Sequence, residues 1–154
     1  MSPAGDNDGI PLCVNCEFAL LKANVVHEAV LLLFRKSLRS LFMLPGWVLR
    51  GPAELTRRLS GEVSVNWRNM PVNEGVVQCM RAALAANRPV FVLTSMPRSW
   101  ASQLCAELGF PQATVVDANG AALADACGAR GFEYIGDGRR DLPLCRAARS
   151  VLLV

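Results

Sequence analysis

The sequence predicts an α/β fold: a doubly wound, Rossmann-like parallel sheet of about five strands, with a helical cap inserted after the first strand. Short apolar runs alternate with helical stretches of about a dozen residues, which is the pattern of βαβ units. Runs such as residues 90–93 are apolar at every position, as expected for strands that helices cover on both faces. The long helical stretch 25–59 separates the first strand from the others and predicts the cap.

The chain is predicted to divide into a polar tail, a core and a cap. The tail is residues 1–9, the core is residues 10–19 together with 74–154, and the cap insertion is residues 20–73. The core begins with an apolar run at residues 10–14, which predicts a short buried strand.

The cap is predicted to be helical over residues 25–59, with two interruptions. The Leu-Pro-Gly run at residues 44–46 and the Gly-Pro pair at residues 51–52 are typical helix breakers. Residues 60–73 are polar and predict an irregular connection. A lid that packs on its own sheet and a surface that contacts a partner are both open for these helices.

After the cap, helices and strands alternate regularly. Asn73, with Glu74 behind it, is a typical helix start, and Gly109 is a typical helix end. The predicted elements are helix 73–86, strand 90–93, helix 97–108, strands 113–116 and 131–135, helix 142–148 and strand 150–154.

Composition narrows the class of protein. The chain has 154 residues, of which 52% are apolar and 19% charged, so it can build one compact domain and is not a disordered chain. Charged residues interrupt every long apolar stretch, so no membrane span is expected. The acidic start, with Asp6 and Asp8, differs from a secretory leader. We therefore expect a cytoplasmic location, with membrane association left open.

Positive charge is concentrated in the cap. The stretch from Arg35 to Arg68 holds seven cations against two carboxylates. Such a stretch forms either a solvated helical face or a contact with a phosphate-rich or membrane surface. The two tryptophans in it belong to no recognisable nucleic-acid motif, so no nucleic-acid partner is expected.

The six cysteines are expected to be reduced, small apolar residues, because most lie in apolar runs. Cys13 and Cys16 form a CxxC pair, but a zinc site would need further ligands and His27 is the single histidine. Cys16 could also act as a thiol nucleophile, although no histidine stands near it in the sequence to activate it.

Polar residues follow two predicted strands at the sheet edge where ligands bind in open α/β folds. Thr94 and Ser95 can hold a phosphate oxygen through a hydroxyl and a backbone N–H. Asp137 and Asp141 flank a glycine turn and can bind Mg²⁺. An ordinary turn in which Asp141 caps the next helix is equally open.

This order of parts resembles the haloacid dehalogenase superfamily of phosphohydrolases. The resemblance covers nearly the whole chain. More narrowly, the chain is similar to the phosphatase-like domain fused ahead of UbiA-type polyprenyltransferases in some bacteria. The stretches that carry this likeness are residues 20–22, 44–51, 70–73, 130–137, 140–143 and 146–149.

The first motif of that family is altered. Family members end the first strand in Asp-x-Asp-Gly-Thr, where the first aspartate attacks phosphorus and the second protonates the leaving oxygen. This chain has Asn15 and Glu17 at these two positions and Phe18 at the glycine. The neutral amide of asparagine is a poor nucleophile and brings no charge to Mg²⁺. The extra methylene of Glu17 moves its carboxyl from the position that the general acid needs.

The lysine that the resemblance implies is also missing from its expected place. Lys22 and Lys36, the two lysines of the chain, both precede the segment 117–128, which is short for the family's third motif. Arg130 could replace the lysine in charge.

The resemblance therefore implies a catalytically inactive phosphatase-like domain that binds a partner. That partner is a membrane prenyltransferase system or a membrane surface, contacted through cap residues 25–59. The alternative is an Mg²⁺-dependent hydrolase of a phosphomonoester, for instance a prenyl-linked one. Mg²⁺ is the cofactor that the resemblance implies, and an asparagine at position 15 weakens its binding.

Overall fold

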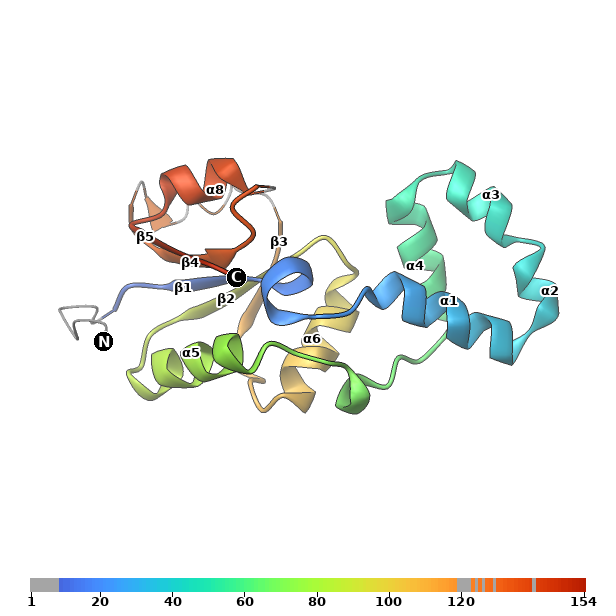
Figure 1. Cartoon of the computed structure of the whole chain (residues 1–154), viewed down its shortest axis with the longest axis horizontal. Helices are drawn as coiled ribbons and strands as arrows, with labels where there is room; N and C mark the ends of the chain where they lie inside the picture. Colours follow the sequence, from blue (N-terminus) through green and yellow to red (C-terminus); the bar gives the residue numbers. More distant parts are fainter. Residues whose placement is uncertain (1–8, 119–122, 124, 126, 129, 140) are drawn as a thin grey trace.

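The computed structural model describes residues 9–118, 123, 125, 127–128, 130–139 and 141–154 (Figure 1). Most of the predicted tail, several residues of the segment 117–128, and Arg140 lie outside the described residues.

The core is a sheet of five parallel strands in the order β3-β2-β1-β4-β5. This confirms the predicted α/β class and the parallel sheet. The strands are β1 (Leu12–Asn15), β2 (Val90–Thr94), β3 (Thr114–Asp117), β4 (Glu133–Gly136) and β5 (Ser150–Leu153). Each strand lies within two residues of its predicted position.

Helices cover both faces of the sheet, as the apolar strands predict. Leu12 and Val14 of β1 face a cluster that includes α5 (Glu74–Ala85) and α6 (Arg98–Glu107), whereas Cys13 faces a second cluster that includes α8 (Leu142–Ala147). Successive side chains of a strand point to opposite faces. The fold is therefore doubly wound.

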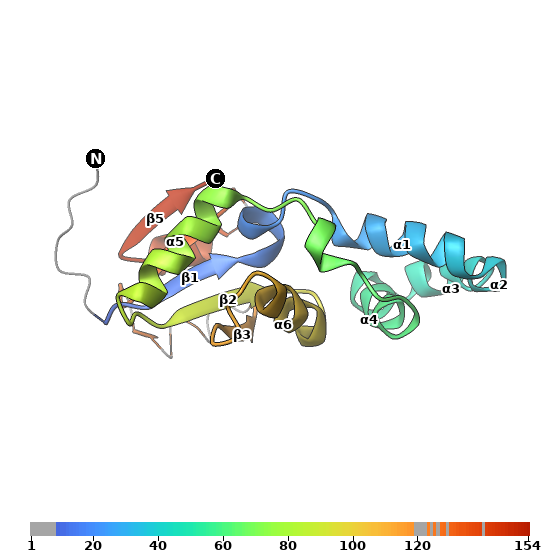
Figure 2. The same ribbon diagram turned by 90° about the horizontal axis from the view of Figure 1, so that it is seen from below.

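The cap between β1 and β2 contains α1 (Val25–Lys36), α2 (Leu38–Leu41), α3 (Leu44–Leu49) and α4 (Pro52–Glu62). Figures 1 and 2 show these helices beyond the carboxyl ends of the strands and not over a face of the sheet. No helix of the described residues is long and apolar enough to cross a membrane.

Two connections join the cap to the core side by side. Leu21 and Val72 form an antiparallel bridge, and the backbone N–H of Lys22 donates to Pro71 O at 2.9 Å. A short 3-10 helix, η2 (Trp67–Asn69), leads into the second connection, where the indole of Trp67 donates to Gln103 Oε1 at 3.0 Å. The two connections between cap and core therefore run side by side next to the sheet edge.

The first break in the cap helices differs from the prediction. Pro45 lies in the first turn of α3, where its missing N–H has no intrahelical partner to lose. The chain breaks earlier instead, at Ser37, which has an extended backbone, and at Phe42 and Met43. The second break, at Gly51, is where the sequence predicts it, with a φ of 103° that favours glycine.

Candidate functional site

The carboxyl ends of β1, β2 and β4 bring five of the six predicted site residues together. Asn15 ends β1 and is 3% exposed, and Thr94 ends β2 and is 1% exposed. Glu17 lies in a single π-helical turn, η1 (Cys16–Leu20), directly after β1. This turn folds the chain back across the strand ends, so that Glu17 reaches Ser95 after β2.

The carboxylate of Glu17 fills the cradle predicted for a phosphate oxygen. Its Oε1 accepts hydrogen bonds from Thr94 Oγ1 at 2.8 Å, from Ser95 N at 2.6 Å and Oγ at 3.0 Å, and from Met96 N at 3.0 Å. Four donors converging on one oxygen form an anion site, since charge-assisted hydrogen bonds are the strongest in proteins. An oxygen of the protein itself occupies it.

The amide of Asn15 closes a second network with Asp141. Its Nδ2 donates to Asp141 Oδ2 at 2.9 Å and lies 3.4 Å from the hydroxyl of Tyr134, while its Oδ1 accepts from the backbone N–H of Phe18 at 3.1 Å. Tyr134 in turn donates its hydroxyl to Asp141 Oδ2 at 2.5 Å. Burial, and then the bond to Asp141, raise the pKa of Tyr134 well above 10.0, so the hydroxyl keeps its proton.

These contacts do not fit Mg²⁺. Asn15 turns N–H groups, not an oxygen, toward Asp141, and its own oxygen accepts from Phe18. A cation needs lone pairs aimed at it, and here one carboxylate oxygen already receives two donors. Over the described ranges, no group of three or more histidine, cysteine, aspartate or glutamate side chains could hold a metal ion.

The remaining predicted ligand, Asp137, stays within its own turn, where its Oδ1 accepts from Arg139 N at 3.0 Å. Asp141 does occupy the N-cap position of α8, as the alternative interpretation has it, but its side chain makes no cap hydrogen bond. It bonds to Asn15 and Tyr134 instead. Asp141 therefore joins β4 to β1.

A cleft of about 530 Å³ opens beside Glu17, between the sheet edge and the cap. Charged or polar groups reach it from Glu17, Lys22 and Ser95. Asn24 and Thr56 add two further polar side chains. The rest of its lining is apolar and comes mainly from η1, the segment that follows it, α1 and α4, including Phe18, Leu21, Val25, Val26, Pro52 and Ala53. Such a cleft has room for an apolar group next to the occupied anion cradle.

The structure argues against two roles considered from the sequence, that of Cys16 as a thiol nucleophile and that of Arg130 in place of a lysine. Cys16 is fully buried, and burial raises the pKa of its thiol well above 9.0, which leaves a protonated and unreactive group. Arg130 precedes β4 and its backbone N–H donates to Ala147 O, so it lies at the opposite end of that strand from the site and is not placed to take the role of the lysine that the resemblance implies. All six thiols are free, as expected.

Sequence reasoning missed Tyr134. It lies within a predicted strand, where a tyrosine is usually a packing residue. A signal was nonetheless present two residues on, because Gly136 is on the same face of β4, and a Cβ there would lie 2.5 Å from the Tyr134 ring. The glycine leaves room for the ring to pass on its way to Asp141.

No family model and no solved structure matches the chain. It is similar to an uncharacterized protein of Sinorhizobium fredii, y4nM, with 27% identity over 154 residues. The match covers 94% of this chain and 30% of that protein. The chain thus spans less than a third of the length of the curated relative it matches.

Proposed function

We propose that this chain is a phosphatase-like domain of the haloacid dehalogenase type that has lost hydrolysis and contacts a partner through its cap. The observation that carries the proposal is the Glu17 carboxylate inside the cradle of Thr94, Ser95 and Met96. A substrate phosphate would have to displace this carboxylate, or bind beside it against like-charge repulsion.

The chemistry of position 15 supports the same proposal. An aspartyl-phosphate mechanism needs a carboxylate whose oxygen can attack phosphorus. Asn15 offers an amide oxygen that accepts from Phe18 N, and an amide nitrogen that donates to Asp141. Both atoms of the amide take part in the fold, and neither is available as a nucleophile.

The proposed partner is a membrane prenyltransferase system, by the resemblance noted from the sequence, with cap residues 25–59 as the contact. In y4nM the matched region is less than a third of the protein, which agrees with a domain that works beside other parts. A polyprenyltransferase encoded next to this chain or fused to it would support this partner, and unrelated neighbours would count against it.

The second candidate is an Mg²⁺-dependent hydrolase of a phosphomonoester with an apolar body, such as a prenyl phosphate. The apolar cleft of about 530 Å³ beside Ser95 favours it. The contacts of Asn15 and Glu17 oppose it.

A phosphatase assay separates the two candidates. Purified chain is incubated with p-nitrophenyl phosphate and with a prenyl phosphate, with and without Mg²⁺. We expect no Mg²⁺-dependent turnover. Turnover that requires Mg²⁺ and disappears in Asp137→Ala, with Asp125→Ala as the matched surface control, would overturn the proposed inactivity.

A further inference from the structure

The end of the cap farthest from the sheet exposes a group of large apolar side chains. Figures 1 and 2 both show α2 and α3 at this end. Within residues 38–49, five side chains are between 58% and 88% exposed. We call these five residues the cap tip: Leu38, Phe42, Met43, Val48 and Leu49.

The cap tip belongs to a folded segment. Trp47, in the same short helix as Val48 and Leu49, is 7% exposed and packs in the main core cluster, with Leu44 against it. The segment therefore has an inner side held by a buried tryptophan and an outer side that faces solvent. Exposed apolar groups gathered in this way mark contact sites in soluble folds.

Cations flank the cap tip and have no acidic partner among the described residues. Arg35 and Arg39 lie near its beginning and Arg50 follows its end. All three are exposed, and none forms an ion pair with another described residue. Lys36 is held by a hydrogen bond from its Nζ to Glu62 O.

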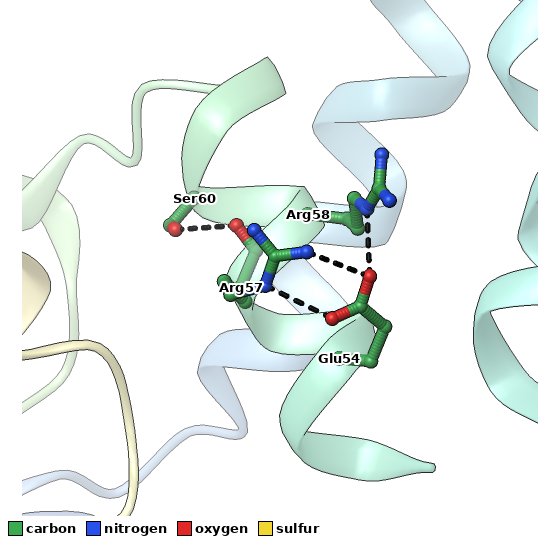
Figure 3. Close-up of polar contacts among 4 residues, drawn as sticks. All are labelled: Glu54, Arg57, Arg58 and Ser60. Carbon is green, nitrogen blue, oxygen red and sulfur yellow. Dashed lines mark hydrogen bonds and ion pairs between the residues drawn. The ribbon is translucent and has the colours of Figure 1, made fainter. Parts of the chain in front are cut away.

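The arginines of α4 differ from those of the tip. The Glu54 carboxylate pairs with both Arg57 and Arg58 (Figure 3). Its Oε1 lies 2.8 Å from a guanidinium nitrogen of each. These hydrogen bonds lower the pKa of Glu54 to about 2, so the carboxylate stays charged and offsets one of the two positive charges beside it. Unneutralised positive charge in the cap is thus greatest where the apolar side chains are exposed.

We propose that the cap tip inserts into the headgroup region of an anionic lipid bilayer. Apolar side chains that enter the acyl boundary and cations that stay among anionic headgroups are the two parts of an interfacial membrane contact. The contact involves one leaflet. This inference names what the cap touches and rests on the contact role proposed above, but not on the loss of hydrolysis.

Vesicle co-sedimentation of the purified chain tests it. Vesicles of phosphatidylcholine alone are compared with vesicles that also contain phosphatidylglycerol, at low and at physiological salt. We expect the chain to sediment with the anionic vesicles and to be released as salt rises. No sedimentation with anionic vesicles at low salt would overturn the proposal.

Two pairs of variants locate the contact. Arg35→Gln/Arg39→Gln should weaken binding by about 5-fold for each cation removed. The control Arg81→Gln/Arg146→Gln removes the same net charge from the core helices and should weaken it far less. Equal losses in both variants would mean that overall charge, not the cap tip, binds the vesicles.

The apolar contribution is tested in the same way. Phe42→Ser/Leu49→Ser should weaken binding by at least about 10-fold, because both side chains leave water on insertion. Leu142→Ser/Leu153→Ser changes two exposed leucines outside the cap, in α8 and β5, and should leave binding unchanged. Binding that survives the tip substitution overturns the proposal.

Other occupants of the tip would give different results. Sedimentation with native membranes but not with protein-free anionic vesicles would point to a membrane protein and overturn the lipid contact. A dimer that Phe42→Ser/Leu49→Ser converts to a monomer would point to a second copy of the chain and overturn it too. None of these variants changes Asn15, Glu17 or Thr94. The outcome of the phosphatase assay is therefore independent of the outcome of the vesicle experiments.

Discussion

Replacing Glu17 by alanine should turn a filled cradle into an empty anion site. In the native chain Oε1 of Glu17 takes all four donors, at 2.6–3.0 Å. In Glu17→Ala these donors remain, held by the end of β2, and converge on a vacant position. Inorganic phosphate should therefore bind to the variant and not to the native protein.

The loss of stability can be estimated from the burial of the donors. Ser95 is exposed, so its N–H and hydroxyl can bond to water after the change. Thr94 and Met96 are buried, but the N–H of Met96 also donates to Thr94 Oγ1 at 3.0 Å and keeps that partner. With hydrogen bonds to a charged group worth about 1.5–3 kcal/mol, we expect a loss of about 2–3 kcal/mol. For a chain of this size that lowers Tm by about 5–10 °C.

Thermal unfolding with increasing phosphate is the assay. Phosphate at about a hundred times its Kd stabilises the folded state by about 2.7 kcal/mol, which would restore most of the lost Tm in Glu17→Ala. The native protein should show no such shift. Glu17→Gln should lose less stability and respond weakly to phosphate, since an amide oxygen still accepts in the cradle.

Two results would refute this reasoning. An equal rise in Tm for native protein and Glu17→Ala would mean that phosphate binds elsewhere. No rise in Glu17→Ala would mean that the four donors do not form an anion site. Glu28→Ala, an exposed glutamate of α1, is the matched control, and its stability should change by no more than about 0.5 kcal/mol.

Three further predictions follow from the same region and from the core. Asn15→Asp should destabilise the metal-free protein by about 3 kcal/mol, because it sets a buried carboxylate against the half-buried carboxylate of Asp141, and Mg²⁺ should then raise its Tm. Gly136→Ala should cost about 1–3 kcal/mol, since the new Cβ would meet the Tyr134 ring at 2.5 Å. Burial raises the pKa of Cys105 from 9.0 to about 11. The neutral thiol therefore contributes its full share to the free energy of unfolding below pH about 9, and this contribution should be lost as pH rises to about 11. Urea unfolding at a series of pH values measures it.

Each has a control. Asn73→Asp keeps a helix N-cap and should create no response to Mg²⁺. Gly75→Ala meets its nearest neighbour at 3.4 Å, within a helix, and should not destabilise. Cys105→Ala should remove the fall in the free energy of unfolding between pH about 9 and about 11. The first argument is contradicted if the Tm of Asn15→Asp equals the native value. The second is contradicted if Gly136→Ala leaves the free energy of unfolding unchanged. The third is contradicted if Cys105→Ala loses stability at alkaline pH as the native protein does.

The strands were predictable because their signal is local. An apolar run such as residues 90–93 needs cover on both faces, and helices on both sides of it imply a parallel sheet. The carboxyl ends of parallel strands lie at one edge of the sheet, so Asn15, Thr94 and Asp141 were expected at that edge. The strand order that makes β1 the neighbour of both β2 and β4 was not predicted. The classification of the fold therefore needed no knowledge of individual contacts.

The contacts of the site were not predictable in the same way. The resemblance implied that Glu17 stands at a general-acid position, with a carboxyl one methylene too long for that role. Its actual role depends on the π-helical turn of η1, whose register is fixed by packing against β2 and α5. Tyr134 was not predicted for a related reason. Its hydroxyl belongs to the site only because the chain folds Asp141, seven residues later, within hydrogen-bond distance of it.

The two ends of the cap differ in what their side chains contact. At the sheet edge the chain supplies its own partners: donors of Thr94 and Ser95 for Glu17, and amide and phenol donors for Asp141. These bonds join the ends of β1, β2 and β4 and form a structural junction at the sheet edge. At the cap tip the part of the chain that the structure describes does not cover the apolar side chains, and burying one as exposed as Phe42 would release roughly 1.5–3 kcal/mol. The exposed apolar surface of the tip can therefore contribute to binding, and a change there should alter binding while leaving the junction intact.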